Sequence, residues 1–396
     1  MNQASEGEEK LGLHAAWAMA VGGMIGGGIF ATLGVVIALA GSLAWVSFLI
    51  GGLIALATGY SYARLTVSYD RSGGAYTFLK QAGHNASARI VAWILILGYI
   101  LTVSVYAYTF GAYLGFAIGG PGWLPGASAA AAIIVLTGVN LLGVGEASGV
   151  EIFAVWIKLA VLVALAALGI WHWAPEQLAL SGIAPGWSGA LVGAASVFIA
   201  YEGFQLLAYD YEDMRDRKVL IGRAMPVAIV TATIVYIVVA LGTAMLVGAD
   251  QVVAQKEVSL AMAGRVALGQ TGFVAVTIAA AFSTASAINA TLFATARLSR
   301  DVAEQGDLPA IFTRTDREGI PYVGILIIAA LALVLAVVGG LASLVQSASI
   351  VFLAVFGIVN AIAWRRQAGP QWVAGAGALG SALALVTLAA HFAGLV

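Results

Sequence analysis

Long runs of apolar residues recur along the whole chain and are separated by short polar stretches. A helix that crosses the hydrocarbon layer of a bilayer needs about 20 apolar residues, and the runs are close to that length. Strand-like alternation of apolar and polar positions is absent from them. The pattern predicts eleven membrane-spanning helices, at residues 13–39, 43–67, 90–118, 127–142, 149–171, 188–209, 225–247, 273–295, 322–341, 345–363 and 372–392.

The composition supports a membrane protein and excludes several other classes. Of the 396 residues, 61% are hydrophobic and only 9% are charged, whereas an average soluble domain has about 25% charged residues. We therefore expect an all-α polytopic membrane protein. The absence of cysteine excludes disulfides and thiolate metal sites, and the net charge of -1 gives no indication of a nucleic-acid partner. The acidic segment 1–10 and the long apolar run behind it argue against a cleavable signal peptide.

The lysines and arginines are distributed unevenly among the loops. If the N-terminus lies in the cytoplasm, fifteen of the 18 lie on the cytoplasmic side, Lys256 and Arg265 lie outside, and Lys158 lies within a span. Under the positive-inside rule, this bias predicts a multi-pass protein of the cell membrane with a cytoplasmic N-terminus. Eleven spans then place the C-terminus outside.

The first span contains five glycines within the nine residues from Gly22 to Phe30. Glycine weakens a helix, and an unwound segment inside a membrane needs another partner for its free amide and carbonyl groups. A broken helix that binds a polar ligand, with the positive end of its second half facing an anionic group, is one interpretation. Close helix packing through small residues is the other, because Gly22 and Gly26 fit the small-xxx-small pattern.

The sixth span carries a similar irregularity, since an ionisable residue and a glycine, Glu202 and Gly203, interrupt its apolar run. Two interrupted helices five spans apart fit an inverted repeat with a substrate site where the breaks face each other at mid-membrane. We therefore expect one transmembrane domain with a first repeat at 13–171, a second at 188–363 and an additional span at 372–392.

Several motifs occur in order along the chain, namely Met24–Phe30, Ser72–Tyr76, Asn140–Gly143, Tyr201–Phe204, and Asn289–Thr291 followed by Arg297, Gly306–Pro309 and Ile320–Pro321. Taken together, they resemble those of the amino acid-polyamine-organocation transporters, and in particular the sodium-independent, proton-coupled prokaryotic amino acid permeases. The resemblance extends from about Leu11 to Arg366. It implies the leucine-transporter-type five-plus-five inverted repeat with broken helices 1 and 6, alternating access, and transport of an amino acid or amine.

The resemblance also implies a substrate site. A substrate carboxylate would bind the backbone N–H groups of Gly26, Gly27 and Gly28. The substrate amine would meet backbone carbonyls, and an aromatic ring would act as a lid; the residues implied are Met24, Ile199, Ala200 and Glu202 for the carbonyls, and Phe204 or Tyr201 for the lid. Gly27 is smaller than the serine or threonine of many members, which leaves either room for a larger ligand or a tighter approach of helices.

Two ionisable residues at membrane depth each have two possible roles. Glu202 is either a structural cap for free N–H groups of the second half-helix or a group that faces the ligand or exchanges protons. Lys158 lies near the centre of span five, at a depth where a charge usually marks an ion or proton pathway. The resemblance implies that Lys158 replaces a bound sodium ion, near Gly22, Ser283 and Ser286, and couples transport to protons. A fixed amine that binds backbone carbonyls is its structural alternative.

We therefore expect a secondary active transporter, a proton-coupled amino acid symporter, with an amino acid or amine exchanger of the same fold as the alternative. Its partners would be a small-molecule substrate, protons and the lipid bilayer, and no cofactor or metal is implied. An intramembrane hydrolase is disfavoured because the four histidines lie near span ends or in loops and no HExxH motif occurs. A channel would fit the paired helix breaks less well. The sequence does not indicate the oligomeric state.

Overall fold

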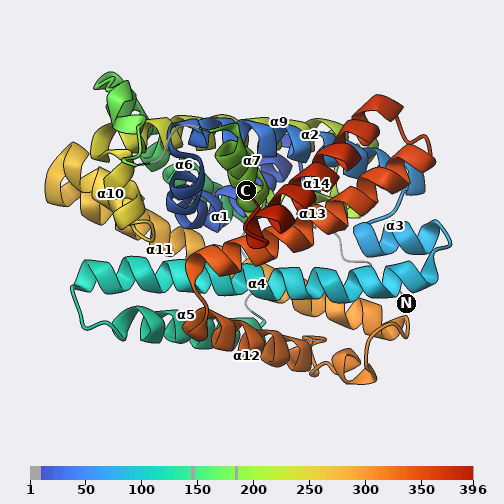
Figure 1. The fold of residues 1–396 in the computed structure, drawn as a ribbon. Helices are drawn as coiled ribbons and strands as arrows, with labels where there is room; N and C mark the ends of the chain where they lie inside the picture. The colour runs from blue at the N-terminus through green and yellow to red at the C-terminus, as the bar shows by residue number, and fades with distance from the viewer. Residues whose placement is uncertain (1–9, 144–147, 183–185, 396) are drawn as a thin grey trace.

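The computed structural model describes residues 10–143, 148–182 and 186–395, and this part of the chain is almost entirely helical (Figure 1). The first half contains α1 Leu13–Ala40, α2 Ala44–Tyr69, α3 Ala75–Gln81, α4 Asn85–Ile118, α5 Leu124–Leu141 and α6 Ser148–Trp171. The second half contains α7 Trp187–Ser196, η3 Val197–Tyr201, α8 Leu206–Tyr209, α9 Arg217–Val247, α10 Ala249–Ala254, α11 Ser259–Glu304, α12 Tyr322–Val338, α13 Leu341–Arg365 and α14 Gln371–Phe392.

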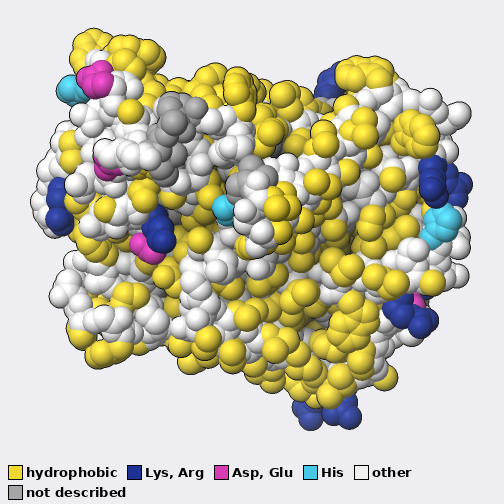
Figure 2. Space-filling view, in the orientation of Figure 1, with side chains coloured by type: hydrophobic (Ala, Val, Ile, Leu, Met, Phe, Trp, Pro, Cys, Tyr) yellow, Lys and Arg dark blue, Asp and Glu magenta, His cyan; other side chains and the backbone are white. Residues whose placement is uncertain are grey.

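The described helices match the eleven predicted spans. Nine are long and apolar enough to cross a membrane, one of which joins α1 and α2 through a short 3-10 turn, and α12 is a shorter apolar helix. Hydrophobic side chains cover most of the face seen in Figure 2, and the few charged ones lie mostly near its edges. The prediction of an all-α polytopic membrane protein is thus confirmed.

Two groups of helices pack against each other. In Figure 1, α4 runs across the lower half with α5 and α12 beneath it, and α1, α2, α7 and α9 lie above. The core between them is formed by buried side chains from nearly every span, and α1 lies at its centre with most of its residues buried. The end of the molecule that carries α3, the α8–α9 loop and the end of α11 is called the α3 side below.

The first span differs from the prediction. Helix α1 continues from Leu13 to Ala40 through the glycine-rich stretch, so the predicted break of helix 1 is absent from this structure. The physical reason is close helix packing through small residues, which was the second interpretation of these glycines. A Cβ on Gly23, Gly26 or Gly28 would lie within 3.1 Å of a neighbouring segment, so these residues allow close packing of α1.

The sixth span is interrupted as predicted. Helix α7 ends at Ser196, a 3-10 segment follows to Tyr201, and the chain becomes extended at Glu202, with φ -62° and ψ 136°. Gly203 then adopts a φ of 129°, which residues with a Cβ rarely adopt, before the short helix α8 begins. The break therefore falls within the predicted motif.

On the α3 side, segments from different spans are tied together. Leu11, just before α1, pairs with the α8–α9 loop through two backbone hydrogen bonds, from its N–H to the Asp213 carbonyl at 2.9 Å and from the Arg215 N–H to its own carbonyl at 3.0 Å. The α2–α3 loop is bound to the same region, because the Gly73 N–H donates to the Ala208 carbonyl at 2.8 Å. The first and sixth spans are thus joined at this end.

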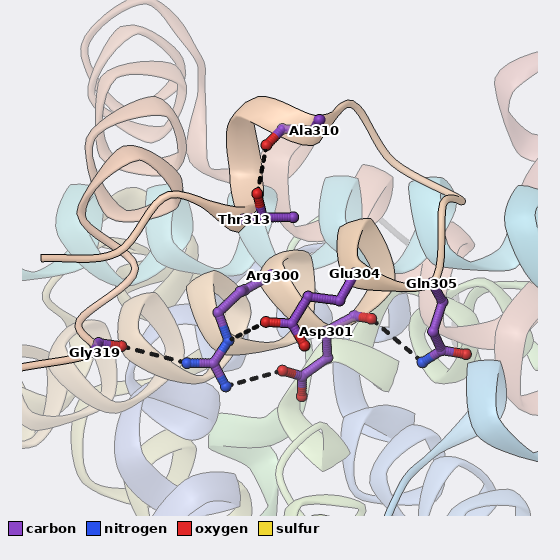
Figure 3. A network of polar contacts seen from close by, with 7 residues as sticks. All are labelled: Arg300, Asp301, Glu304, Gln305, Ala310, Thr313 and Gly319. Atoms are coloured by element: carbon purple, nitrogen blue, oxygen red, sulfur yellow. Dashed lines mark hydrogen bonds and ion pairs between the residues drawn. The ribbon is translucent and has the colours of Figure 1, made fainter.

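The end of α11 is joined to the loop that follows it (Figure 3). Arg300 donates to the Gly319 carbonyl at 3.3 Å and forms ion pairs with Asp301 at 3.1 Å and Glu304 at 3.5 Å. The hydrogen bond to Gly319 holds the chain between α11 and α12 against the end of α11, and the two ion pairs within α11 orient the Arg300 side chain.

Candidate functional site

The predicted substrate residues of the first and sixth spans do come together. A Cβ on Gly23 would lie 3.1 Å from the Cα of Gly203, and one on Gly28 would lie 2.9 Å from the Cα of Ala200. Both pairs leave no room for a side chain between α1 and the interrupted span. The two predicted halves of the site therefore contact each other directly in this structure.

A tyrosine of the seventh span bridges these two halves. The Tyr236 hydroxyl lies 2.7 Å from the carbonyl oxygens of both Met24 and Ala200. Because a hydroxyl has one proton, it donates to only one of these carbonyls at a time. Two carbonyls that the resemblance implies for amine binding thus converge on one donor.

Gln205 organises the break itself. Its side-chain oxygen accepts a hydrogen bond from the Gly203 N–H at 2.9 Å, and its amide nitrogen donates to the Glu202 carboxylate at 2.7 Å. The same nitrogen lies 3.3 Å from the Tyr99 hydroxyl. Glu202 is buried, with 2% of its surface exposed.

Gly27 faces α4. A Cβ on Gly27 would lie 2.1 Å from the ring of Tyr106, so the ring fills the space that a side chain would occupy. The small residue at this position therefore permits a tighter approach of helices, and it leaves no extra room for a ligand in this structure.

The two candidates for an aromatic lid are packed inside the bundle. Tyr201 donates a hydrogen bond to the Phe48 carbonyl of α2, and its ring contacts that of Tyr236. The ring of Phe204 packs edge-to-face against that of Tyr62. The N–H of Ile199, another predicted substrate residue, donates to the Ser349 hydroxyl at 3.0 Å.

A cavity of about 870 Å³ extends from the middle of the protein to exposed residues of the α3 side. Its deep part is lined by Lys158, Gly22 and Ser286, which are three of the four residues predicted for proton coupling. The fourth, Ser283, is buried and donates a hydrogen bond to the Ile25 carbonyl at 3.3 Å, which joins α11 to α1. Lys158 is itself 4% exposed.

A buried carboxylate lies beside the outer part of this cavity. Asp307, after the end of α11, forms an ion pair with Lys80 of α3 at 2.5 Å and with Arg89 at 3.0 Å, and accepts a hydrogen bond from Tyr76 at 2.8 Å. Burial acts to raise the pKa of Asp307, but hydrogen bonds from Lys80, Tyr76 and Arg89 outweigh it and lower that pKa to about 2. This Asp307 cluster fixes α3 to the end of α11.

A second acidic residue of the cavity wall has the opposite shift. Asp210, the first residue after the sixth span, lines the cavity. Burial raises the pKa of Asp210 to about 6, the charge of Asp213 adds to the increase, and Arg297 opposes it. The group therefore changes charge close to physiological pH. Among the described residues, no group of three or more His, Asp or Glu side chains is placed to hold a metal ion.

The comparison with known proteins decides the family. A model of the amino acid permease family matches residues 11–394. The chain belongs to the amino acid permease family. It is therefore a multi-pass membrane transporter and not an enzyme, and the predicted resemblance to this superfamily is confirmed.

Three proteins named as transporters or exchangers are similar to this permease. It is 32% identical to the inner membrane transport protein YbaT of Escherichia coli, over 89% of this chain and 84% of that protein. It is 24% identical to the serine/threonine exchanger SteT of Bacillus subtilis, over 76% and 70% of the two chains. Asc-type amino acid transporter 1 of Mus musculus is 27% identical, over 91% and 72%.

Two residues of the site were not predicted from the sequence. Tyr236 lies in a predominantly apolar span that also contains Thr231, Thr233 and Thr243, and Gln205 follows the recognised motif by one position. A polar side chain at membrane depth was the available signal for Tyr236, but the three threonines of the same span gave the same signal. Tyr99 and Tyr106 belong to a tyrosine-rich span; Tyr99 lines the cavity, whereas Tyr106 is buried against α1.

Proposed function

We propose that this permease carries an amino acid across the cytoplasmic membrane by secondary active transport. The observation that carries the proposal is the cavity, which reaches Lys158 from the α3 side, while α1 and the interrupted span close against each other at Gly28 and Ala200. A path open to one side and closed beyond it is what alternating access requires. With a cytoplasmic N-terminus, the cavity faces the cytoplasm.

In this proposal the repeats 13–171 and 188–363 move relative to each other, and the span 372–392 is an addition to them. The substrate carboxylate binds the amides of Gly26, Gly27 and Gly28 once α1 opens locally, which the weak helical preference of glycine favours. The substrate amine then donates hydrogen bonds to the carbonyls of Met24 and Ala200, in place of the Tyr236 hydroxyl that binds them in this structure.

Transport is coupled to protons through Lys158. Its position beside Gly22 and Ser286, in the deep part of the cavity, supports an ammonium group in the place of a sodium ion. A lysine amine can gain and lose a proton, so a change in the protonation of Lys158 during the cycle is chemically feasible. Each protonation state would favour a different packing of α1.

The test is uptake of radiolabelled amino acids into proteoliposomes of the purified permease. We expect uptake without sodium that rises as the external pH falls, and a Lys158→Ala variant that no longer responds to pH. Lys10→Ala, which removes an exposed lysine ahead of α1, is the control and should behave like the wild type. Sodium-stimulated wild-type uptake, or an unchanged pH response in Lys158→Ala, would reject proton coupling through this lysine.

Exchange is the second candidate, and the similarity to a protein named as a serine/threonine exchanger favours retaining it. Uptake that requires amino acid inside the vesicle and is indifferent to the pH gradient would identify an exchanger. Net uptake into empty vesicles would identify a symporter.

A further inference from the structure

Glu202 lies in the break of the sixth span, where the chain is extended and the side chain is buried. A carboxylate at such a position has two possible tasks, namely to cap free backbone N–H groups or to bind a ligand. A capping carboxylate accepts hydrogen bonds from backbone N–H groups, whereas a ligand-binding carboxylate does not need them. The hydrogen-bond partners of Glu202 in the structure therefore distinguish the two roles.

The capping task is performed by Gln205. Its side-chain oxygen binds the Gly203 N–H, which is the backbone group freed at the break. Within the described part of the chain, no backbone N–H donates to Glu202; its carboxylate accepts a hydrogen bond from the neutral amide of Gln205. Gln205 thus holds Glu202 in place and leaves it without a capping role.

The side-chain groups that the structure places next to the Glu202 carboxylate are neutral. Within the described part of the chain, they are the amide of Gln205 and the hydroxyl of Tyr106. An ionised carboxylate that is buried without a cation is unfavourable, because neutral donors do not replace all of its lost hydration; it is stabilised either by binding a proton or by a cation. A positively charged group of a bound ligand would supply that cation.

Neutral donors and backbone carbonyls surround Glu202. The Tyr106 hydroxyl is buried next to Glu202 and is a second neutral donor for its carboxylate. The carbonyls of Met24 and Ala200 share the single proton of Tyr236. A region of this kind is complementary to a ligand with several N–H donors and a positive charge.

Glu202 is also close to the route of entry. Gln205, which holds Glu202, lies 3.3 Å from the hydroxyl of Tyr99, and Tyr99 lines the cavity. One side chain therefore separates the carboxylate from the cavity wall. A small movement of α8 relative to α4 would open this contact.

We propose that Glu202 determines substrate specificity by binding a cationic side chain of the transported amino acid. The substrate class is then the basic amino acids, with the α-ammonium group at the carbonyls of Met24 and Ala200 and the second ammonium group at Glu202. This inference rests on the proposed function, because it assumes that an amino acid binds between α1 and the sixth span.

The experiment compares two ligands of equal chain length, L-lysine and L-norleucine, which differ in the terminal ammonium group. Ligand affinity is measured from the concentration dependence of thermal stabilisation of the purified permease. The variants are the wild type, Glu202→Gln, and Glu176→Gln as a control at an exposed glutamate of the loop after α6. Competition against labelled lysine uptake in proteoliposomes provides the second readout.

We expect the wild type and Glu176→Gln to bind lysine at least about tenfold more tightly than norleucine, since a hydrogen-bonded charge pair contributes roughly that factor or more. In Glu202→Gln the preference should disappear, with norleucine affinity unchanged; that unchanged affinity also shows that the variant is folded. A wild type that prefers norleucine overturns the inference even if Glu202→Gln fails to fold.

Two further outcomes are distinguishable. If Glu202→Gln weakens both ligands equally and alters the pH profile of uptake, Glu202 serves in proton transfer and the specificity role is wrong. If neither these ligands nor any other amino acid raises the thermal stability of the permease or competes with labelled lysine uptake, the proposed function itself fails. Binding of neutral amino acids alone would leave the function intact and reject the substrate class.

Discussion

Gly23 of α1 and Gly203 of the sixth span lie against each other, so close that a Cβ on either residue would lie within 3.1 Å of the backbone of the other. The contact is between two main chains, with no side chain between them. The proposed entry of a substrate requires these two segments to separate or slide, and at this contact only the main chains of two glycines face each other.

Gly203→Ala should destabilise the protein. The φ of 129° disfavours any residue with a Cβ, and that Cβ would lie 2.6 Å from the carbonyl carbon of Gly23. Strain and overpacking together should cost roughly 2 to 4 kcal/mol. Thermal unfolding of the detergent-purified variant measures this loss of stability.

Gly222→Ala, in α9 with nothing within 4 Å of the new Cβ, is the matched control and should gain up to about 1 kcal/mol of stability. Equal unfolding temperatures for Gly203→Ala and the wild type would contradict the close contact.

Asp307→Asn should release α3 from the end of α11. The lowered pKa of Asp307 means that its stabilising effect is present above the ordinary carboxyl pKa near 4 and is lost as the pH falls toward 2. At neutral pH the variant should lose roughly 1.5 to 3 kcal/mol, the usual contribution of hydrogen bonds to a charged group. Hydrogen exchange should become faster in Ala75–Gln81, the helix α3.

The control for this prediction is Asp301→Asn, which removes a half-exposed carboxylate from the same end of α11 (Figure 3). An exposed ion pair contributes about 1 kcal/mol or less, so exchange in α3 should stay as in the wild type. If both variants accelerate exchange in α3 to the same extent, the Asp307 cluster is not the contact that holds this helix.

Asp210→Asn should make stability less sensitive to pH. Because burial raises the pKa of Asp210 to about 6, the folded wild type binds the proton more tightly than the unfolded chain does. The cost of the buried charge is absent below about pH 4, appears as the pH rises to 6, and is complete above 6. The variant should therefore exceed the wild type by roughly 2 kcal/mol at pH 7.5, and the difference should vanish near pH 4.

Denaturation curves at a series of pH values test this. Asp213→Asn, which removes the neighbouring charge and leaves Asp210 in place, should only shift the wild-type transition to a lower pH. Parallel pH profiles for Asp210→Asn and the wild type would show that Asp210 has the same pKa in the folded and unfolded chains, which would contradict the raised pKa.

The spans were predictable because the bilayer imposes them: a backbone at membrane depth has to satisfy its own hydrogen bonds, so apolar runs become helices. Their ends were less predictable. Helix α11 extends from Ser259 to Glu304, well beyond the apolar run 273–295, because outside the hydrocarbon layer a helix needs no apolar residues. A kink at Leu268 and Gly269 marks where its first segment turns.

The same argument from glycine and polar residues succeeded in one span and failed in the other. At Glu202 and Gly203, an ionisable group and a positive φ interrupt the helix. In the first span, the glycines are required by what packs against them, such as the ring of Tyr106 against Gly27, and a sequence does not display such neighbours. Tyr236 escaped prediction for the same reason, since its role depends on two carbonyls from distant parts of the chain.

The pairing of Leu11 with the α8–α9 loop has a consequence for how this permease tolerates mutation. Both hydrogen bonds use main-chain atoms, so any side chain at Leu11, Asp213 or Arg215 preserves them except proline at Leu11 or Arg215, where the donor N–H would be lost. The start of the first span and the chain after the sixth are consequently linked by a contact that sequence divergence hardly affects. Homologues that share no side chain at these positions can inherit the same mechanical link.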